Sequence, residues 1–119
     1  MVGMGDRQFE IRPWGSFTVL DDAETHKVKS LTVQPGHRLS YQRHRLRAEH
    51  WFVVVGTATV TIDDTVHTVQ RGEYIDIPMK AWHRIENRGD GELTFIEVQH
   101  GSYFGEDDIE RQSDDYGRA

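Results

Sequence analysis

"GHRLSYQRHRLRAEHWFVVVG", residues 36–56, is the stretch that decides the fold of this chain. It starts and ends with glycine, and it carries an amide, three imidazoles and a carboxylate ahead of an apolar run. Gln42 and His44 are two residues apart, so on a strand both side chains point to the same face. Glu49 follows five residues later, after a segment that can bend and reset the register. Nitrogen and oxygen donors of this kind suit a divalent cation.

The composition limits the class of protein. A chain of 119 residues suggests one domain, which buries roughly two-thirds of its unfolded surface. There is no cysteine, so disulfides and thiolate metal sites are excluded. The first residues lack the apolar run of a signal peptide, and no later run is long enough to span a bilayer. We therefore expect a cytoplasmic protein without a membrane partner.

The net charge of −6 is spread unevenly along the chain. Residues 106–119 contain six acidic and two basic residues, whereas the other 105 residues contain fourteen acidic and twelve basic ones. This acidity argues against nucleic acid as a partner. We expect the acidic tail to form a short helical turn followed by a loop.

Alternating and β-branched runs dominate the chain, and residues 9–100 show no sustained helical periodicity. Turn signals separate the runs, and "DD" at 63–64 predicts a hairpin. Many short strands at this spacing indicate an all-β sandwich or barrel of antiparallel strands. The predicted strands are Phe17–Leu20, His26–Val33, Leu39–Gln42, His50–Val55, Thr57–Ile62, Val66–Gln70, Tyr74–Ile77, His83–Asn87 and Leu93–Gln99.

A second group of candidate residues follows a later strand. His83 comes after a turn that contains Pro78, and it could reach the first group if two sheets close on each other. Two neutral imidazoles, a carboxylate and a Gln carbonyl would then make a four-ligand site. Each histidine taken alone is more simply a structural or surface residue. The joint spacing is what favours a metal site.

Both groups fit the paired motifs of the cupin family. The first motif is G-x5-H-x-H-x4-E-x6-G, with Gln42 in place of the first histidine, and the second is G-x5-P-x-G-x2-H-x3-N, with Lys80 in place of the middle glycine. Longer segments, among them "RPWGSF" and "IPMKAWHRIEN", make nearly the whole chain resemble the type II phosphomannose isomerase domain. That domain is often fused behind a mannose-1-phosphate guanylyltransferase, an activity for which this chain has no nucleotide-binding segment.

The resemblance implies a fold, a ligand and a reaction. The fold is a single cupin domain over residues 1–119, a double-stranded β-helix or jelly-roll barrel, with a barrel core at about 9–100 and an acidic tail at 101–119. The reaction is the interconversion of mannose 6-phosphate and fructose 6-phosphate through an enediol(ate). A homodimer is also implied, and the doubly apolar strand at 50–55 favours it.

The resemblance further implies that Gln42, His44, Glu49 and His83 bind one divalent metal ion. Zinc is the first expectation, and cobalt, manganese, nickel and iron are alternatives.

The isomerisation also needs a base and an anchor for the phosphate. Candidate catalytic residues are Glu97, His50 and Lys80, and a metal-bound water is a further candidate base. Glu97 lies inside an apolar strand, where it is either a buried base or a sheet-edge carboxylate paired with an arginine. Candidate phosphate ligands are Arg12, Arg47 and Lys80, because cationic groups match phosphate.

Other functions stay open. The family commonly has further histidines where this chain has Arg45 and Leu46, which favours a non-catalytic sugar-phosphate-binding or regulatory cupin. A cupin isomerase that acts on another sugar fits the same motifs. A cupin oxygenase is disfavoured by Gln42, because redox cupins more usually present three histidines with the glutamate.

Overall fold

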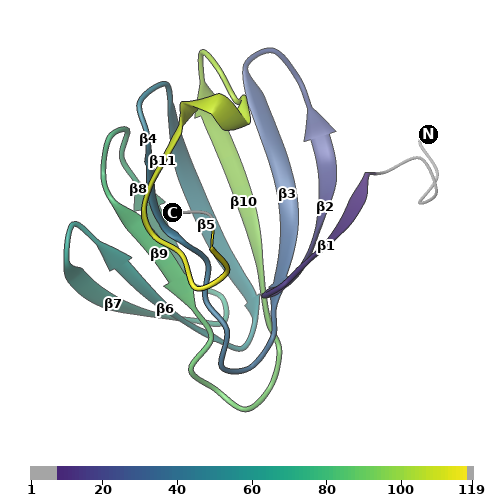
Figure 1. Cartoon of the computed structure of the whole chain (residues 1–119). Helices are drawn as coiled ribbons and strands as arrows, with labels where there is room; N and C mark the ends of the chain where they lie inside the picture. Colours follow the sequence, from purple (N-terminus) through teal and green to yellow (C-terminus); the bar gives the residue numbers. More distant parts are fainter. Residues whose placement is uncertain (1–7, 118–119) are drawn as a thin grey trace.

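Two antiparallel β-sheets face each other in the computed structural model, which describes residues 8–117 (Figure 1). The first seven residues, considered above for a signal peptide, and the last two lie outside the described range. The larger sheet has six strands in the order β1 (Phe9–Arg12), β2 (Gly15–Asp22), β3 (His26–Val33), β10 (Leu93–Gly101), β5 (Arg47–Val55) and β8 (Tyr74–Ile77). The smaller sheet has five strands in the order β11 (Ile109–Ser113), β4 (Tyr41–His44), β9 (His83–Glu86), β6 (Thr57–Ile62) and β7 (Thr65–Gln70).

The all-β, antiparallel prediction is confirmed. The hairpin between β6 and β7 is also as predicted, with Asp63 and Asp64 both at positive φ. A 3₁₀ turn, η2 (Glu106–Asp108), precedes β11. Within residues 8–117, no helix is long and apolar enough to cross a membrane.

The two central strands of the larger sheet change from apolar to polar along their buried faces. On β10 the inward residues pass from Leu93 and Phe95 to Glu97 and Gln99, and all four are buried. The paired strand β5 makes the same change from Val53 and Trp51 to Glu49 and Arg47, which are buried too. One end of the barrel is therefore an apolar core, and the other end holds charged groups that need buried partners.

Residues 8–117 leave part of the outward face of β5 uncovered. Trp51 and Val53 pack in the barrel, but Phe52 and Val54 are 41% and 40% exposed on the other side of the same strand. An apolar outer face of this kind is the feature on which the expected homodimer depends.

The motif glycines stand where the backbone takes positive φ. Gly36, Gly56 and Gly72 have φ of 80°, 84° and 85°. At Gly56 a Cβ would lie 2.7 Å from the carbonyl oxygen of Glu92, so only glycine allows β10 to come this close. Lys80, which replaces the remaining motif glycine, has φ of 70° and adopts a conformation that is strained for a residue with a side chain.

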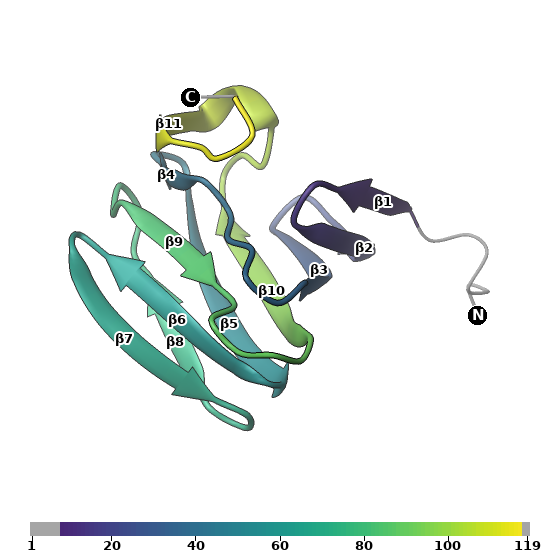
Figure 2. The same cartoon turned by 60° about the horizontal axis from the view of Figure 1, so that its bottom comes forward.

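Near both ends of the described residues, the chain forms strands that the sequence did not predict. Strand β1 pairs with β2, although it is short and half exposed. The tail forms the expected turn at η2, but the prediction of a loop after it is wrong, because β11 pairs with β4 (Figure 2). Ion pairs hold this last segment in place: Glu110 lies 3.0 Å from Arg43, and Asp115 lies 2.8 Å from Arg38.

Candidate functional site

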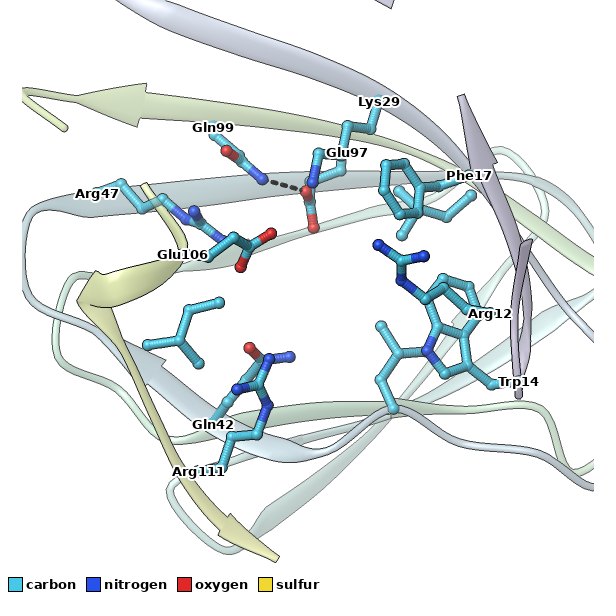
Figure 3. Close-up of a pocket in the computed structure, with 13 residues that line it drawn as sticks. Arg12, Trp14, Phe17, Lys29, Gln42, Arg47, Glu97, Gln99, Glu106 and Arg111 are labelled. Atoms are coloured by element: carbon cyan, nitrogen blue, oxygen red, sulfur yellow. Dashed lines mark hydrogen bonds between the residues drawn. The ribbon is translucent and has the colours of Figure 1, made fainter. Parts of the chain in front are cut away.

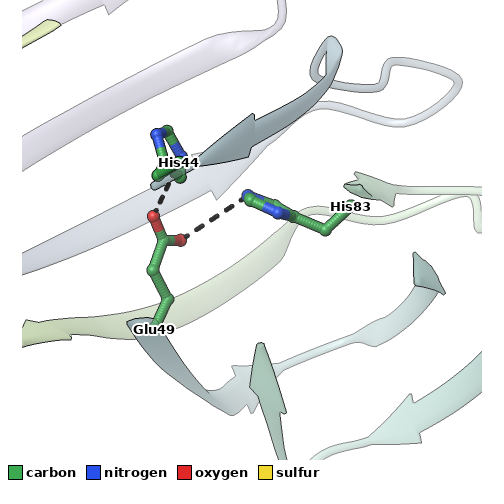
Figure 4. A group of neighbouring side chains, drawn as sticks. All are labelled: His44, Glu49 and His83. Carbon is green, nitrogen blue, oxygen red and sulfur yellow. Dashed lines mark ion pairs between the residues drawn. The ribbon is translucent and has the colours of Figure 1, made fainter. Parts of the chain in front are cut away.

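Three buried side chains meet at the polar end of the barrel (Figure 4). Glu49 comes from β5 in the larger sheet, whereas His44 and His83 come from β4 and β9 in the smaller one. Their potential ligand atoms all lie within 4.8 Å of one another. The Nε2 atom of His44 is 3.2 Å from Oε2 of Glu49, and Nε2 of His83 is 4.0 Å from Oε1. The cluster thus joins the two sheets around one carboxylate.

Neighbouring groups fix the orientation of these side chains. Nε1 of Trp51 donates a hydrogen bond to Oε1 of Glu49 at 2.9 Å. Nδ1 of His83 lies 3.0 Å from the carbonyl oxygen of Ala81. A carbonyl can only accept, so Nδ1 carries the hydrogen and Nε2 presents its lone pair toward Glu49. Burial also lowers the pKa of His83, which favours the neutral form that a metal ligand needs.

Glu49 is ionised in this setting. Burial alone would raise its pKa, but the hydrogen bond with His44 and the electrostatic interactions with His83 and Arg47 outweigh burial. The pKa of Glu49 is therefore held well below its usual range. A buried carboxylate that remains negative beside two imidazoles is a suitable centre for a cation.

Gln42 completes the set that the motifs predicted. Its Cα pairs with that of His83 across β4 and β9, and it lines the same small compartment as the cluster. The compartment has a volume of about 30 Å³, enough for one ion or water molecule. A buried His-Glu-His group with an adjacent amide therefore fits a divalent metal ion with nitrogen and oxygen ligands.

Arg47 stands against this cluster. Its Nε donates to Oε2 of Glu49 at 2.9 Å, and its Nη2 lies 3.1 Å from Nε2 of His44. The side chain is buried and lines both the small compartment and a larger cavity beside it. Arg47 thus lies between the small compartment and the larger cavity and presents its positive charge to both.

The larger cavity has a volume of about 260 Å³ (Figure 3) and shares Gln42, Arg47 and Glu97 with the lining of the small compartment. Four cationic side chains and two aromatic ones are among its lining residues. They are Arg12, Lys29, Arg47, Arg111, Trp14 and Phe17. A cavity of this make-up suits a small polar ligand with an anionic group.

Glu97 lies where the two spaces meet. Burial, together with the negative charge of Glu49, raises the pKa of Glu97 to about 8, although Lys29 offsets part of the shift. Nε2 of Gln99 donates to Oε1 of Glu97 at 2.6 Å and fixes its orientation. Strand β10 lies between β3 and β5, so the reading of Glu97 as a sheet-edge carboxylate is wrong. A carboxyl with this pKa can exchange a proton near neutral pH.

The structure places two predicted catalytic residues outside both spaces. His50 faces outward on β5, where its Nδ1 lies 2.6 Å from Oδ1 of Asp76 and its ring stacks on Tyr74. Lys80 is exposed on the turn before β9, and its contact with the site is a backbone hydrogen bond of 2.7 Å to the carbonyl oxygen of His44. Of the predicted phosphate ligands, Arg12 and Arg47 line the larger cavity and Lys80 does not.

The departure from the family pattern at Arg45 and Leu46 lies on an exposed bend. The backbone N–H groups of both residues donate to the Asp108 carboxylate, at 3.3 and 2.9 Å. Neither side chain lines the compartment or the cavity. The changed positions therefore contact the C-terminal segment instead of the candidate site.

Sequence reasoning missed several residues of the cavity. Lys29 carried a usable signal, because it shares the alternating inward face of Leu31 and Val33 on β3. Gln99 is likewise two residues from Glu97 on the inward face of β10. Arg111 had no such signal, because it enters the cavity through a strand that the sequence did not predict.

Solved structures of low sequence identity share the fold. Oxalate decarboxylase from Lactobacillus farciminis superposes with a TM-score of 0.78 at 24% identity, over 92% of this chain and 34% of that one. The cupin domain of Schizosaccharomyces pombe Cnp3 superposes with a TM-score of 0.70 at 14% identity, over 72% of this chain and 64% of that one. These likenesses establish a cupin fold.

Curated relatives are much closer in sequence. The alginate biosynthesis protein AlgA of Pseudomonas aeruginosa is 52% identical over 108 residues, which are 91% of this chain and 22% of AlgA. The mannose-1-phosphate guanylyltransferase of Escherichia coli K12 is 50% identical over 108 residues, which are 91% of this chain and 23% of that protein. The chain thus spans about a fifth of the length of these relatives. Residues 6–114 match the family model described as mannose-6-phosphate isomerase C-terminal, and the chain belongs to this family.

Proposed function

We propose that this chain is a metal-dependent mannose-6-phosphate isomerase, which interconverts mannose 6-phosphate and fructose 6-phosphate through an enediol(ate). The observation that carries the proposal is the position of Glu97. This carboxyl, with a pKa raised to about 8, lies between a buried His-Glu-His cluster and a cavity lined by cations. Membership of the isomerase family supports the same reaction.

Glu97 is the proposed base. Isomerisation moves a proton between C2 and C1 of the sugar, so one group must accept the proton from one carbon and return it to the other. Glu97 can do both because its pKa lies close to neutral pH. The hydrogen bond from Gln99 keeps the carboxyl oriented toward the cavity while the proton moves.

Gln42, His44, Glu49 and His83 are the proposed metal ligands, with zinc as the expected ion. A bound divalent ion would polarise the sugar carbonyl and stabilise the oxyanion that develops on it.

Cations around the larger cavity are the proposed phosphate anchor. Arg12, Lys29 and Arg111 reach it from three separate strands or strand ends. Arginine offers a planar pair of donors that matches phosphate, and lysine adds a further charge. Remote binding of this kind holds the reacting carbons in place.

A coupled assay tests the reaction directly. The purified chain is stripped with EDTA, reloaded with Zn²⁺, Co²⁺ or Mn²⁺, and supplied with mannose 6-phosphate, and fructose 6-phosphate is measured. We expect turnover only with metal, and a Glu97→Gln variant should lose at least about 100-fold in kcat at unchanged metal content. Glu24→Gln, an exposed carboxylate, is the control. Turnover of another hexose phosphate instead would indicate a different sugar, and sugar-phosphate binding without turnover would favour the non-catalytic cupin.

A homodimer is proposed separately from the reaction. The uncovered apolar side chains Phe52, Val54 and Tyr74 on the outer face of the larger sheet support it. Gel filtration with light scattering at micromolar concentration should give twice the chain mass, and Phe52→Glu should shift the protein to a monomer. A wild-type monomer would contradict the proposal.

A further inference from the structure

Arg47 has contacts that phosphate binding does not explain. It is 6% exposed, and its guanidinium engages Glu49 Oε2 and His44 Nε2, two atoms of the candidate metal cluster. The other cavity arginines, Arg12 and Arg111, line the larger cavity and not the small compartment. Arg47 therefore differs from them in touching both spaces.

The contacts of Arg47 and the binding of a metal through Nε2 of His44 exclude each other. A guanidinium only donates hydrogen bonds, so a bond from Arg47 uses the one lone pair of Nε2. If Nε2 carries a proton instead, that proton is directed to Oε2 of Glu49, 3.2 Å away. In either tautomer, Nε2 has no lone pair for a cation.

Charge leads to the same conclusion. A guanidinium in contact with Glu49 and His44 would lie within a few ångströms of a divalent ion shared by those residues, in a buried site where like charges repel strongly. The third contact of Arg47, from Nη1 to the carbonyl oxygen of Phe104, is long at 3.4 Å and gives little resistance to movement. The larger cavity, which Arg47 already lines, offers a place for the displaced charge.

We propose that Arg47 is a switch between the two spaces: it holds Glu49 and His44 until a divalent cation takes these ligands, and then turns into the larger cavity to bind the anionic group of the ligand. The inference rests on the metal site of the proposed function and not on its isomerase activity. Cation binding and anion binding should consequently strengthen each other.

Metal affinity gives the first test. Zn²⁺ affinity is measured by chelator competition, without any sugar, for the wild type, Arg47→Met and the control Arg12→Met. Removing the competing guanidinium should tighten Zn²⁺ binding at least about tenfold in Arg47→Met, while Arg12→Met should stay within about twofold of the wild type. A residue with only a structural role would leave the affinity of Arg47→Met unchanged or weaker, and either result overturns the proposal.

A second variant covers the case in which Arg47→Met does not fold. Arg47→Lys keeps the positive charge but cannot bond to Glu49 and His44 through a planar pair of donors. If thermal unfolding shows that Arg47→Met has lost cooperative structure, Arg47→Lys must bind Zn²⁺ at least about threefold more tightly than the wild type. An affinity equal to or below that of the wild type overturns the proposal here as well.

Anion binding gives an independent test. Sulfate, a soluble dianion, is titrated by calorimetry into the wild type and Arg47→Met, each in EDTA and loaded with Zn²⁺. The wild type should gain about tenfold in sulfate affinity on loading, and Arg47→Met should lose most of that gain. An equal gain in both proteins would mean that the metal alone attracts the anion, which overturns the switch. Absence of mannose 6-phosphate turnover would contradict the proposed isomerase activity. It would leave the Zn²⁺ and sulfate affinity measurements unaffected.

Discussion

The small compartment and the larger cavity are built from different parts of the chain. Residues 42–83 supply the proposed ligands of the compartment: Gln42, His44 and Glu49 stand at short spacings, and His83 comes from a later strand. The cavity depends on both ends of the described chain, with Arg12 entering beside β1 and Arg111 on β11. The proposed metal ligands therefore depend largely on motif spacing, whereas the larger cavity depends on long-range pairing near both ends of the described residues.

Glu49→Gln should weaken metal binding in the small compartment and leave anion binding in the larger cavity intact. The variant keeps the shape of the side chain but removes the one carboxylate that His44, His83 and Arg47 surround. Since even groups that only orient a metal ligand change affinity by about 10–100-fold, loss of the carboxylate should weaken Zn²⁺ binding by at least about 100-fold. Chelator competition measures this. Full metal content in the variant would contradict the ligand assignment, and retained sulfate binding would show that the cavity is intact.

Glu97→Gln should change how the stability of the metal-free protein depends on pH. The pKa of Glu97 is about 8 in the folded protein and near 4.5 when unfolded. Between these values the folded state holds a proton that the unfolded chain has released, so this residue makes stability fall as pH rises. Relative to the wild type, the variant should gain about 3–4 kcal/mol in free energy of unfolding between pH 5 and pH 8.

Urea denaturation in EDTA at several pH values measures the Glu97 effect. Taking the difference between the two proteins isolates the titration of Glu97 together with its coupling to Glu49, whose negative charge contributes to the raised pKa. A difference that stays constant across this pH window would show that Glu97 titrates normally and would remove the main support for its role as base.

Much of the compartment could be predicted from the sequence, because its geometry is local. Gln42 and His44 share a strand face by alternation, and glycine at positions 36, 56 and 72 marks the turns. The position of His83 could not be predicted from alternation alone, because its approach to Glu49 depends on two sheets closing on each other. The family motif supplied that link.

The cavity could be predicted only in part, because its walls depend on tertiary pairing. Strand β11 has a polar sequence that gives no strand signal by itself. It forms because β4 offers an edge and because Arg43 and Arg38 pair with Glu110 in the strand and Asp115 after it. Tertiary contacts here override local propensity. The position of Arg47 against the His-Glu-His cluster depends on hydrogen-bond geometry, which cannot be read from residue spacing.

Arg111→Met should weaken sugar-phosphate binding in the larger cavity without affecting metal binding in the small compartment. The variant removes a cation that reaches the cavity from β11, so affinity for fructose 6-phosphate should fall about tenfold, while the Zn²⁺ content stays at the wild-type level. Calorimetry with metal-loaded protein measures the sugar phosphate. Arg71→Met, at an exposed turn, is the matched control. Equal affinity in wild type and Arg111→Met would place the phosphate elsewhere, and loss of zinc in this variant would show that the two spaces are not separable.

Lys80→Gly should have the smallest effect, a gain in stability without any change in binding. Lys80 has φ of 70°, a conformation that glycine adopts without steric cost, and its exposed side chain lines neither space. The backbone N–H that holds the carbonyl oxygen of His44 is kept in the variant. Relief of strain, less the added chain entropy of glycine, should raise the free energy of unfolding by about 1 kcal/mol.

Thermal unfolding tests Lys80→Gly best when it is compared with the opposite kind of substitution, a side chain placed at a glycine of positive φ. At Gly36, φ is 80° and no atom lies within 4 Å of an added Cβ, so Gly36→Ala should lose stability through backbone strain alone. The two variants should shift the melting temperature in opposite directions, by roughly 4 °C each. If Lys80→Gly melts at or below the wild-type temperature, or changes Zn²⁺ affinity, the lysine contributes to the site through its side chain. That outcome would restore it as a candidate functional residue.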